Sequence, residues 1–499
     1  MEAGRWRGAV GAGVTLLLCA MLSAEARTEP PVETDEPAWL TTSDLAWELL
    51  ATGSGPARWA AAFDERGLGD WGNKNPPLGK YLIGGSIAHV EVARPFDYAW
   101  SWGISRAEQT RLPPDHLLRA GRVPIRVMGW LCLVTVFALA HVLTAGSLWA
   151  LLAPLLLFLV PSFQYHALRI YTDVPEVWLI LLSVLLLMQH ARNGKRAWLF
   201  GGMVCGGLAC AVKLSAGAMC VGAALYVLHL ALRRNIRPWV AATALAAAPL
   251  AYVAINPYLY PNPVGRSFET IEQWGASKQA QQQDARLKLG AVHSRAEGMA
   301  LVSKRGVWLE AHLATPRTSS IEHLPLLLPA GLLLALAGAL ALLAAGRRPR
   351  LAGSRRVTGA FALAILLAWM AQLGLTAELH LLGPLLAAGA LAIALRSRAR
   401  GPREPALVLL YTLGASWLLT GLWLPFDWKG YYLPVACLAV AVPALGAAAL
   451  SDCVTFARTR PEGAPLPWMG RAGLAASALA AVAILVWSWD TLMRLPLFA

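Results

Sequence analysis

Charged residues are scarce in this sequence: Asp, Glu, Lys and Arg make up 14% of its 499 residues, whereas soluble globular proteins carry about 25%. Hydrophobic residues make up 57%, and the mean hydropathy is +0.50. This balance excludes an ordinary soluble enzyme. Apolar runs of roughly 17–25 residues, the length that crosses the hydrocarbon core of a bilayer, recur along the chain. The sequence therefore predicts an all-α polytopic membrane protein.

We expect about thirteen membrane-spanning helices in a single domain over residues 1–499, because each long apolar run can cross the bilayer once. The runs are residues 8–24, 124–144, 147–162, 174–190, 198–213, 214–232, 238–256, 324–346, 357–376, 378–395, 405–424, 431–450 and 472–490. No internal repeat of fixed period is evident, which argues against a repeat architecture.

The formal net charge is +14, but its distribution argues against nucleic acid as a partner. Basic residues gather in alternate short loops, and the positive-inside rule places these loops and the N-terminus in the cytoplasm. The clusters are Arg5/Arg7, Arg192/Lys195/Arg196, Arg233/Arg234/Arg237, Arg347/Arg348/Arg350/Arg355/Arg356, Arg396/Arg398/Arg400/Arg403 and Arg458/Arg460/Arg471. Two long loops, residues 25–123 and 257–323, then lie on the extracytoplasmic side.

Cysteine is missing from both long outer loops. Its seven occurrences are Cys19, Cys132, Cys205, Cys210, Cys220, Cys437 and Cys453, all in or beside apolar runs. This placement excludes disulfide staples and a thiolate zinc site in the outer loops. The cytoplasmic loops are at most roughly 20 residues long, too short for a nucleotide-binding domain, and no glycine-rich phosphate fingerprint follows a strand. Any chemistry is expected at the outer face, on substrates delivered by the membrane.

The first apolar run has two interpretations. Arg5 and Arg7, the apolar stretch and Ala24-Glu25-Ala26 also fit a signal peptide with a cleavage site between small residues. We expect an uncleaved anchor, because an anchor gives the acidic pair that follows it a fixed position at the membrane surface.

The outer loops contain amphipathic stretches at residues 38–50, 78–92 and 267–289. Trp39, Trp47 and neighbouring leucines suit a helix lying at the membrane surface, with tryptophan at headgroup level. We expect all three stretches to be helices that cover the outer end of the bundle.

Ionisable and polar residues recur at the predicted outer ends of spans, and each has a structural alternative. Asp35 and Glu36 precede Pro37, a common arrangement in solvated turns. Asn75 could cap a helix that has Pro76 in its first position and continues through Lys80. Asp173 or Thr172 could cap the helix that contains Glu176, with Arg169 just before it. Lys213 could snorkel to water, and Tyr431 fits an aromatic belt, which does not explain Lys429.

The order of these motifs resembles the GT-C membrane glycosyltransferases, most closely glycosyltransferase family 39, which contains protein O-mannosyltransferases and aminoarabinose lipid A transferases. The resemblance is carried by the acidic pair after the first span, by Pro76-Pro77-Leu78-Gly79-Lys80, and by Arg169-x-x-x-Asp173-x-Pro175. Gly207-Leu208-Ala209-x-x-x-Lys213 and Lys429-x-Tyr431-x-x-Pro434 are similar to later family segments. The similarity covers roughly residues 8–232 well and the C-terminal half only at scattered points.

The resemblance implies a GT-C-type bundle whose catalytic acidic position is Asp35, with Glu36 as its neighbour. Asn75 stands where mannosyltransferases carry His and lipid A transferases carry Lys, so it leaves the donor and acceptor open. Lys213 matches the basic residue suited to the carrier phosphate, and Arg169 and Asp173 match the outer mouth of the fourth span.

The expected chemistry agrees with these positions. The phosphate of a polyprenyl-phosphate sugar is a good leaving group, so the reaction needs a base for the acceptor hydroxyl and cations for the developing phosphate charge. Asp35 is the predicted base, and one carboxylate on the attacking face implies inversion. The predicted donor-binding residues are Lys80, Arg169, Asp173, Lys213, Lys429 and Tyr431, and Asn75 and Glu176 are assigned to the acceptor or pocket. We expect no cofactor; the partners are the donor, membrane lipids and a protein or glycolipid acceptor.

Two other functions stay open. A metal-dependent enzyme resembling oligosaccharyltransferases would use Asp35, Asp173 and Glu176 as oxygen ligands for Mg²⁺ or Mn²⁺. A secondary transporter would place charges near the middle of the bilayer and show repeats or broken helices, whereas the ionisable residues here gather at the ends of spans.

Overall fold

A computed structural model gives the fold, and it describes residues 2–25, 30, 32–33, 35–65, 75–94, 96, 112–283, 291–307, 403–426, 429–442, 444–445 and 448. Within these residues every regular element is a helix, and the only β-type pairing is an isolated bridge between Ala291 and Phe426. The predicted all-α class is confirmed.

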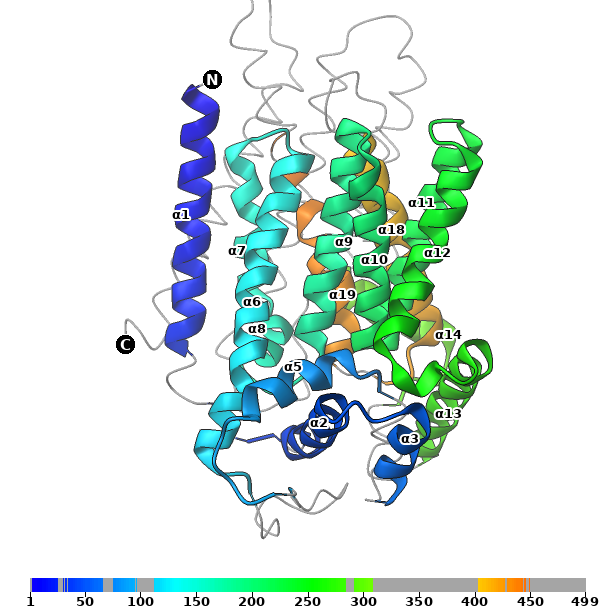
Figure 1. The fold of residues 1–499 in the computed structure, drawn as a ribbon. Coiled ribbons are helices and arrows are strands. Elements are labelled where there is room, and N and C mark those ends of the chain that lie inside the picture. The colour runs from blue at the N-terminus through cyan, green and yellow to red at the C-terminus, as the bar shows by residue number, and fades with distance from the viewer. Residues whose placement is uncertain are drawn as a thin grey trace, which may run out of the picture.

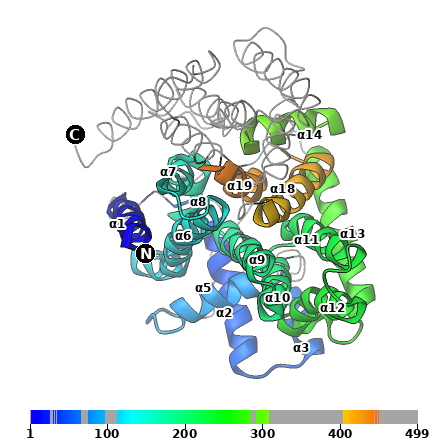
Figure 2. The same ribbon diagram turned by 90° about the horizontal axis from the view of Figure 1, so that it is seen from above.

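Long helices run side by side and form the body of the molecule (Figure 1). They are α1 (Glu2–Glu25), α6 (Asp115–Leu143), α9 (Asp173–Asn193), α10 (Arg196–Val212), α11 (Gly217–Leu232), α12 (Pro238–Ile255) and α18 (Arg403–Trp423), with the shorter α19 (Lys429–Ala439). In Figure 2, α9 lies near the middle of the described helices and α1 at their edge. The burial of α9 agrees with this central place: Val177, Ile180 and Leu181, which lie on one side of the helix, are all buried.

Five of the described helices are long and apolar enough to cross a membrane: Asp115–Leu143, Asp173–Asn193, Leu214–Leu232, Pro238–Ile255 and Glu404–Trp423. They correspond to five of the predicted spans. The predicted spans at 324–346, 357–376, 378–395 and 472–490 lie outside the described residues, so the number thirteen stays a prediction.

The helix predicted at 147–162 covers Leu148–Leu159 and is interrupted near its predicted end. The chain forms a 3₁₀ turn (η2, Leu148–Leu151) and then α7 (Leu152–Leu159), and it breaks at Val160 before α8 (Pro161–Ala167). Val160 has an extended backbone, with φ −71° and ψ 113°. The cause is Pro161, because a residue before proline is disfavoured in the helical region.

Helix α6 begins nine residues before the predicted span at 124–144, at Asp115. Its first turns carry charged residues such as Arg119 and Arg122, which lower the local hydropathy and hide the helix from a search for apolar runs. Arg122 is nevertheless only 2% exposed. A buried arginine requires a partner, and that partner belongs to the end of the molecule described next.

Four helices gather at the end of the bundle opposite the N-terminus: α2 (Glu36–Ala51), α3 (Pro56–Glu65), α5 (Leu78–Ile87) and α13 (Pro263–Gln283) (Figure 1). Helices α2, α5 and α13 fall in the three stretches predicted as surface helices, whereas α3 lies outside all three and was not predicted. Helix α2 differs from that prediction because it is buried along most of its length, Trp39 included. It lies against α5, where a Cβ on Gly84 would collide with the carbonyl oxygen of Ser43.

A small second core fixes α2 to its neighbours. Leu45 and Leu49 of α2 pack with Trp59 and Phe63 of α3 and with Leu259 of the short turn η4 (Pro257–Leu259).

The predicted capping of α5 by Asn75 is wrong, because the helix begins at Leu78 with Pro77 before it. Asn75 instead belongs to the loop leading into α5, so the first turn of this helix lacks a side-chain cap.

Candidate active site

The ends of α9, α10 and α19 meet at the end of the bundle that carries α2 and α5, and each contributes a predicted site residue. Asp173 is the first residue of α9, Lys213 directly follows α10, and Tyr431 lies in the first turn of α19. The Nζ of Lys213 donates to Oδ1 of Asp173 at 2.6 Å and lies 5.7 Å from the centre of the Tyr431 ring. Residues far apart in the sequence are therefore neighbours.

Gly430 makes the close approach of α19 to α9 possible. A Cβ at this position would collide with Oδ1 of Asp173 and would lie 3.4 Å from Nε2 of His166. The nearest atoms belong to the carboxylate that receives the hydrogen bond of Lys213. A side chain larger than that of glycine would therefore disturb the ion pair directly.

Asp35 occupies the N-cap position of α2, but its side chain makes no capping hydrogen bond. The residue is half-buried. Burial raises the pKa of Asp35 to about 6; the nearby Glu33 and Asp173 carboxylates act in the same direction, and Lys278 and Lys213 oppose them. The carboxyl group therefore lies within the electrostatic field of the Lys213–Asp173 pair, and it is less exposed than a solvated turn would leave it.

Glu36 plays a different part from Asp35. Its carboxylate is completely buried and accepts two hydrogen bonds from Arg122, at 2.8 Å to Oε1 and 2.7 Å to Oε2. The backbone N–H groups of Ile170 and Glu33 donate to the same carboxylate at 2.9 and 3.0 Å. With both oxygens occupied, Glu36 joins α2, α6 and the loop before α9, and so holds the residue next to it, Asp35, in position.

Arg169 lies beside this group and faces an aromatic ring. Its guanidinium carbon is 4.1 Å from the centre of the Tyr165 ring, and its Nε is 3.7 Å from Oε1 of Glu33. Stacking and a loose ion pair orient the guanidinium while its Nε, among the described residues, lacks a hydrogen-bond partner. An arginine held in this way can grip a phosphate oxygen with little rearrangement.

Glu176 lies one turn into α9 and is completely buried. Its Oε1 accepts a hydrogen bond of 2.7 Å from the hydroxyl of Ser215, and its Oε2 has no hydrogen-bond partner among the described residues. Ser215 belongs to the turn η3 (Leu214–Ala216) directly after Lys213. Glu176 therefore lies beside the Lys213–Asp173 pair, in a position to support the turn that carries the lysine.

Lys80 is oriented toward its own loop. Its side chain is completely buried, its Nζ donates to the Asn75 carbonyl at 2.6 Å, and it lies 5.3 Å from the centre of the Phe63 ring. Burial lowers the pKa of Lys80 to about 7. The geometry gives Lys80 and Asn75 a role in shaping the entry to α5; contacts with the donor or acceptor stay predictions. The side chain of Lys429 lies outside the described residues.

Four side chains at the site escaped prediction from the sequence. Glu33 and Lys278 act on Asp35 through their charges, Arg122 holds Glu36, and His166 faces Gly430. Arg122 and Lys278 lie in helices α6 and α13, and their positions along those helices do not show which distant residues they contact. Glu33, two residues before Asp35, carried the one available signal, a third carboxylate beside the acidic pair.

Lys278 is brought to the site by a contact between distant segments. The side chain of Gln282, at the end of α13, donates to the Pro425 carbonyl at 2.8 Å, and Val292 N–H donates to the same carbonyl at 3.0 Å. These bonds fasten α13 to the segment before α19. Lys278 then lies 5.9 Å from the centre of the Phe426 ring.

A carboxylate metal site would require several ligands converging on one point. Across the part of the chain that the structure describes, no three His, Cys, Asp or Glu side chains are grouped closely enough to hold a metal ion. Of the three predicted ligands, Asp173 pairs with a lysine and Glu176 with a serine.

Residues 70–264 match the family model of dolichyl-phosphate-mannose-protein mannosyltransferases. The predicted resemblance to glycosyltransferase family 39 is thereby confirmed for this part of the chain. The mannosyltransferase match contains Asn75, Lys80, Arg169 and Lys213, and it begins after the acidic pair. No curated protein sequence matches the chain.

Solved structures of membrane glycosyltransferases are similar to the chain at low identity. ArnT from Cupriavidus metallidurans bound to undecaprenyl phosphate is 12% identical, with 97% of this chain and 72% of that chain covered and a TM-score of 0.44. The archaeal oligosaccharyltransferase AglB from Archaeoglobus fulgidus, in complex with an inhibitory peptide and a dolichol-phosphate, is 12% identical, with 84% and 47% covered and a TM-score of 0.39.

Proposed function

We propose that the protein is an integral-membrane inverting glycosyltransferase that moves a sugar from a polyprenyl-phosphate donor to a hydroxyl group of a protein or glycolipid acceptor. The observation that carries the proposal is the position of Asp35, a half-buried carboxylate of raised pKa within the electrostatic field of the Lys213–Asp173 pair. The mannosyltransferase family match over residues 70–264 supports the same class of donor.

Asp35 acts as the general base in this proposal. Its carboxylate takes the proton of the acceptor hydroxyl, whose oxygen forms a bond to the anomeric carbon of the sugar. The bond between that carbon and the phosphate oxygen breaks, and the polyprenyl phosphate leaves with the bonding electrons. A base with a pKa of about 6 is mostly ionised at neutral pH and is a better proton acceptor than a solvated aspartate.

The cations near Asp35 have the charge that the leaving phosphate requires. The hydrogen bond to Asp173 holds the ammonium group of Lys213 in a fixed position before substrate binds. A charge that is already in place does not have to reorient during the reaction, which lowers the free-energy cost of stabilising the leaving phosphate. Arg169 lies 3.7 Å from the Glu33 carboxylate, and the charge of Lys278 acts on Asp35. Lys213 is the proposed principal phosphate contact, and Arg169 is the second.

The reaction is proposed to occur on the extracytoplasmic face, on the strength of the positive-inside distribution of arginine and lysine. Cysteine introduced at Ala276, exposed two residues before Lys278, or at Ala51, exposed at the far end of α2 from Asp35, should react with an impermeant thiol reagent in intact cells. Cysteine at Asn193, at the opposite end of α9, should react only after lysis. The reverse pattern would place the site in the cytoplasm.

Transfer with purified components tests the activity. The protein in detergent should move a radiolabelled sugar from a polyprenyl-phosphate donor to a hydroxyl acceptor, and the product should have the inverted anomeric configuration. Transfer should continue in EDTA; loss of transfer in EDTA, restored by Mn²⁺ or Mg²⁺, would favour the metal-dependent alternative. Donor movement across vesicles without any transferred sugar would favour a transporter.

A further inference from the structure

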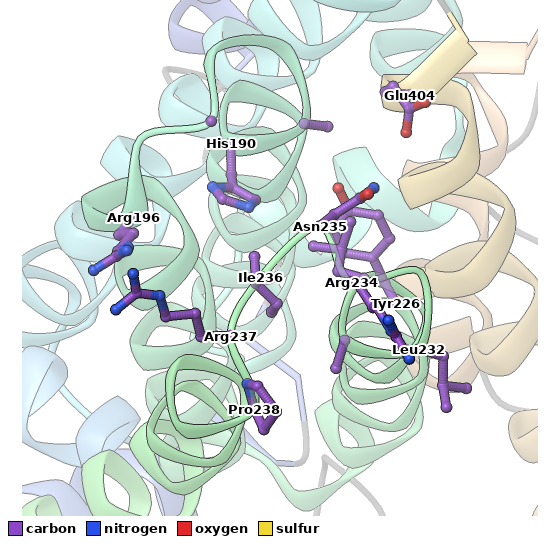
Figure 3. Close-up of a pocket in the computed structure, with 14 residues that line it drawn as sticks. His190, Arg196, Tyr226, Leu232, Arg234, Asn235, Ile236, Arg237, Pro238 and Glu404 are labelled. Carbon is purple, nitrogen blue, oxygen red and sulfur yellow. The ribbon is translucent and has the colours of Figure 1, made fainter.

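A hollow of about 970 Å³ opens at the end of the bundle opposite Asp35. Figure 3 shows the side chains that line it. It lies between the loop joining α9 to α10, the loop joining α11 to α12, and the first turn of α18. Helix α9 has Asp173 at one end and His190 near the other, and its 21 residues span roughly 30 Å at about 1.5 Å per residue. The hollow is therefore separate from the candidate active site.

Positive charge dominates its lining. Arg196, Arg234 and Arg237 border the hollow, and Glu404 is its only carboxylate among the lining residues. Arg196 lies 5.4 Å from the centre of the Trp239 ring. The three arginines are exposed and none of them forms an ion pair with another residue of the described ranges, so an anionic ligand would not have to displace a carboxylate partner.

Tyr226 provides a second and independent observation. Its side chain is completely buried, yet it borders the hollow, so it forms the inner wall. Its hydroxyl group has no hydrogen-bond partner among the residues that the structure describes. A buried hydroxyl without a partner loses its hydrogen bond to water. Its oxygen has almost no accessible surface, so a ligand oxygen reaches it only when the Tyr226 side chain turns toward the hollow.

The backbone conformation of Arg234 also suggests that its side chain has a functional role. Helix α11 ends in a Schellman-type C-terminal turn, in which the N–H of Asn235 donates to the carbonyl of Leu230 at 2.9 Å. Arg234 has φ 57° in this turn, a left-handed conformation that glycine adopts more easily. An arginine at this position carries a strain that glycine would avoid.

We propose that this hollow is a binding site for a phosphate group, supplied by the headgroup of an anionic membrane lipid or by free phosphate. Guanidinium groups bind phosphate oxygens through two parallel hydrogen bonds, and the Tyr226 hydroxyl would donate a further one once its side chain turns toward the hollow. Leu232 and Trp239 at this end of the bundle are 84% and 52% exposed, and this apolar surface would contact the acyl chains of a lipid ligand.

Equilibrium binding to the full-length purified protein in an uncharged detergent tests the proposal. The probes are tritiated dioctanoyl phosphatidylglycerol, tritiated dioctanoyl phosphatidylcholine and inorganic ³²P-phosphate. The variants are Arg234→Gln/Arg237→Gln and Tyr226→Phe, with Arg233→Gln as the matched control, because Arg233 is an exposed arginine of the same loop that does not line the hollow. Thermal unfolding and sugar transfer verify that each variant is folded.

The double variant should bind the anionic probe roughly tenfold or more weakly, Tyr226→Phe several-fold more weakly, and Arg233→Gln as the wild type does. Selective binding of phosphatidylglycerol with no competition from inorganic phosphate would identify a lipid headgroup, and saturable binding of inorganic phosphate would identify the free anion. Equal binding by the double variant and the control, or equal binding of both lipids, would overturn the proposal and leave these arginines a purely topological role.

Discussion

The buried pair of Glu36 and Arg122 offers a direct test of how the catalytic loop is held. The side chains are 0% and 2% exposed, and two hydrogen bonds of 2.8 and 2.7 Å join them. Arg122→Met keeps an unbranched apolar stem but lacks the guanidinium group, so both bonds to Glu36 are lost. The Glu36 carboxylate would then remain buried with only the N–H groups of Ile170 and Glu33 as donors.

Leaving one member of a buried ion pair without its partner costs about 3–5 kcal/mol. We expect Arg122→Met to lower the free energy of unfolding by about that amount, measured by tryptophan fluorescence during denaturation in detergent. Sugar transfer should fall as well, because Asp35 is adjacent to Glu36 and its position depends on where α2 begins. Donor binding through Lys213, which is on another helix end, should change less.

A second substitution separates charge burial from loss of packing. Adding Glu36→Gln to Arg122→Met removes the uncompensated charge while the amide can still accept from Ile170 N–H, so the double variant should recover most of the stability. Arg119→Met, at an exposed position one turn earlier on α6, serves as the control. The reasoning is refuted if Arg122→Met is as stable as Arg119→Met, or if the double variant is no more stable than Arg122→Met.

Three further predictions concern the site itself. Lys213→Ala should weaken binding of the polyprenyl-phosphate donor by about 1.5–3 kcal/mol, and Lys213→Arg should keep part of the affinity; unchanged affinity in equilibrium binding would leave Lys213 only its ion pair. Gly430→Ala should lose most transfer, because its methyl group would collide with the carboxylate paired with Lys213, while Gly414→Ala, with nothing within 4 Å of its Cβ, should keep it. The transfer rate should fall as the pH drops below about 6, since Asp35 is then protonated and cannot accept a proton; a flat profile between about pH 5 and 7 would contradict its role as base.

Hydropathy alone located much of the helix bundle. The apolar runs at 174–190, 214–232 and 238–256 correspond closely to α9, α11 with its preceding turn, and α12. These helices are surrounded by lipid or by other helices over their whole length, so they consist mostly of apolar residues and can be recognised by their composition. The break at Val160 could have been predicted, because Pro161 is visible in the sequence and its effect on the preceding residue is local.

The charged contacts of the site could not be deduced in the same way. Lys213 has no charged neighbour in the sequence, yet Asp173 lies 2.6 Å away, 40 residues earlier in the chain. Glu36 and Arg122 are 86 residues apart, and no periodic pattern connects them. Such pairs depend on how helices dock, which a single sequence does not specify. The motifs indicated which residues gather at one end of the bundle, and the structure shows which of them form ion pairs with one another.

The central claim is that Asp35 removes the proton of the acceptor, and Asp35→Asn tests it most directly, because the amide keeps the shape of the side chain but cannot accept the proton. The measurement is single-turnover transfer from a purified polyprenyl-phosphate sugar, with donor affinity and thermal unfolding recorded on the same preparation. We expect transfer to fall by roughly 10²–10⁴-fold, the usual contribution of a general base, with donor affinity and unfolding close to those of the wild type. Near-normal transfer by Asp35→Asn would contradict the account.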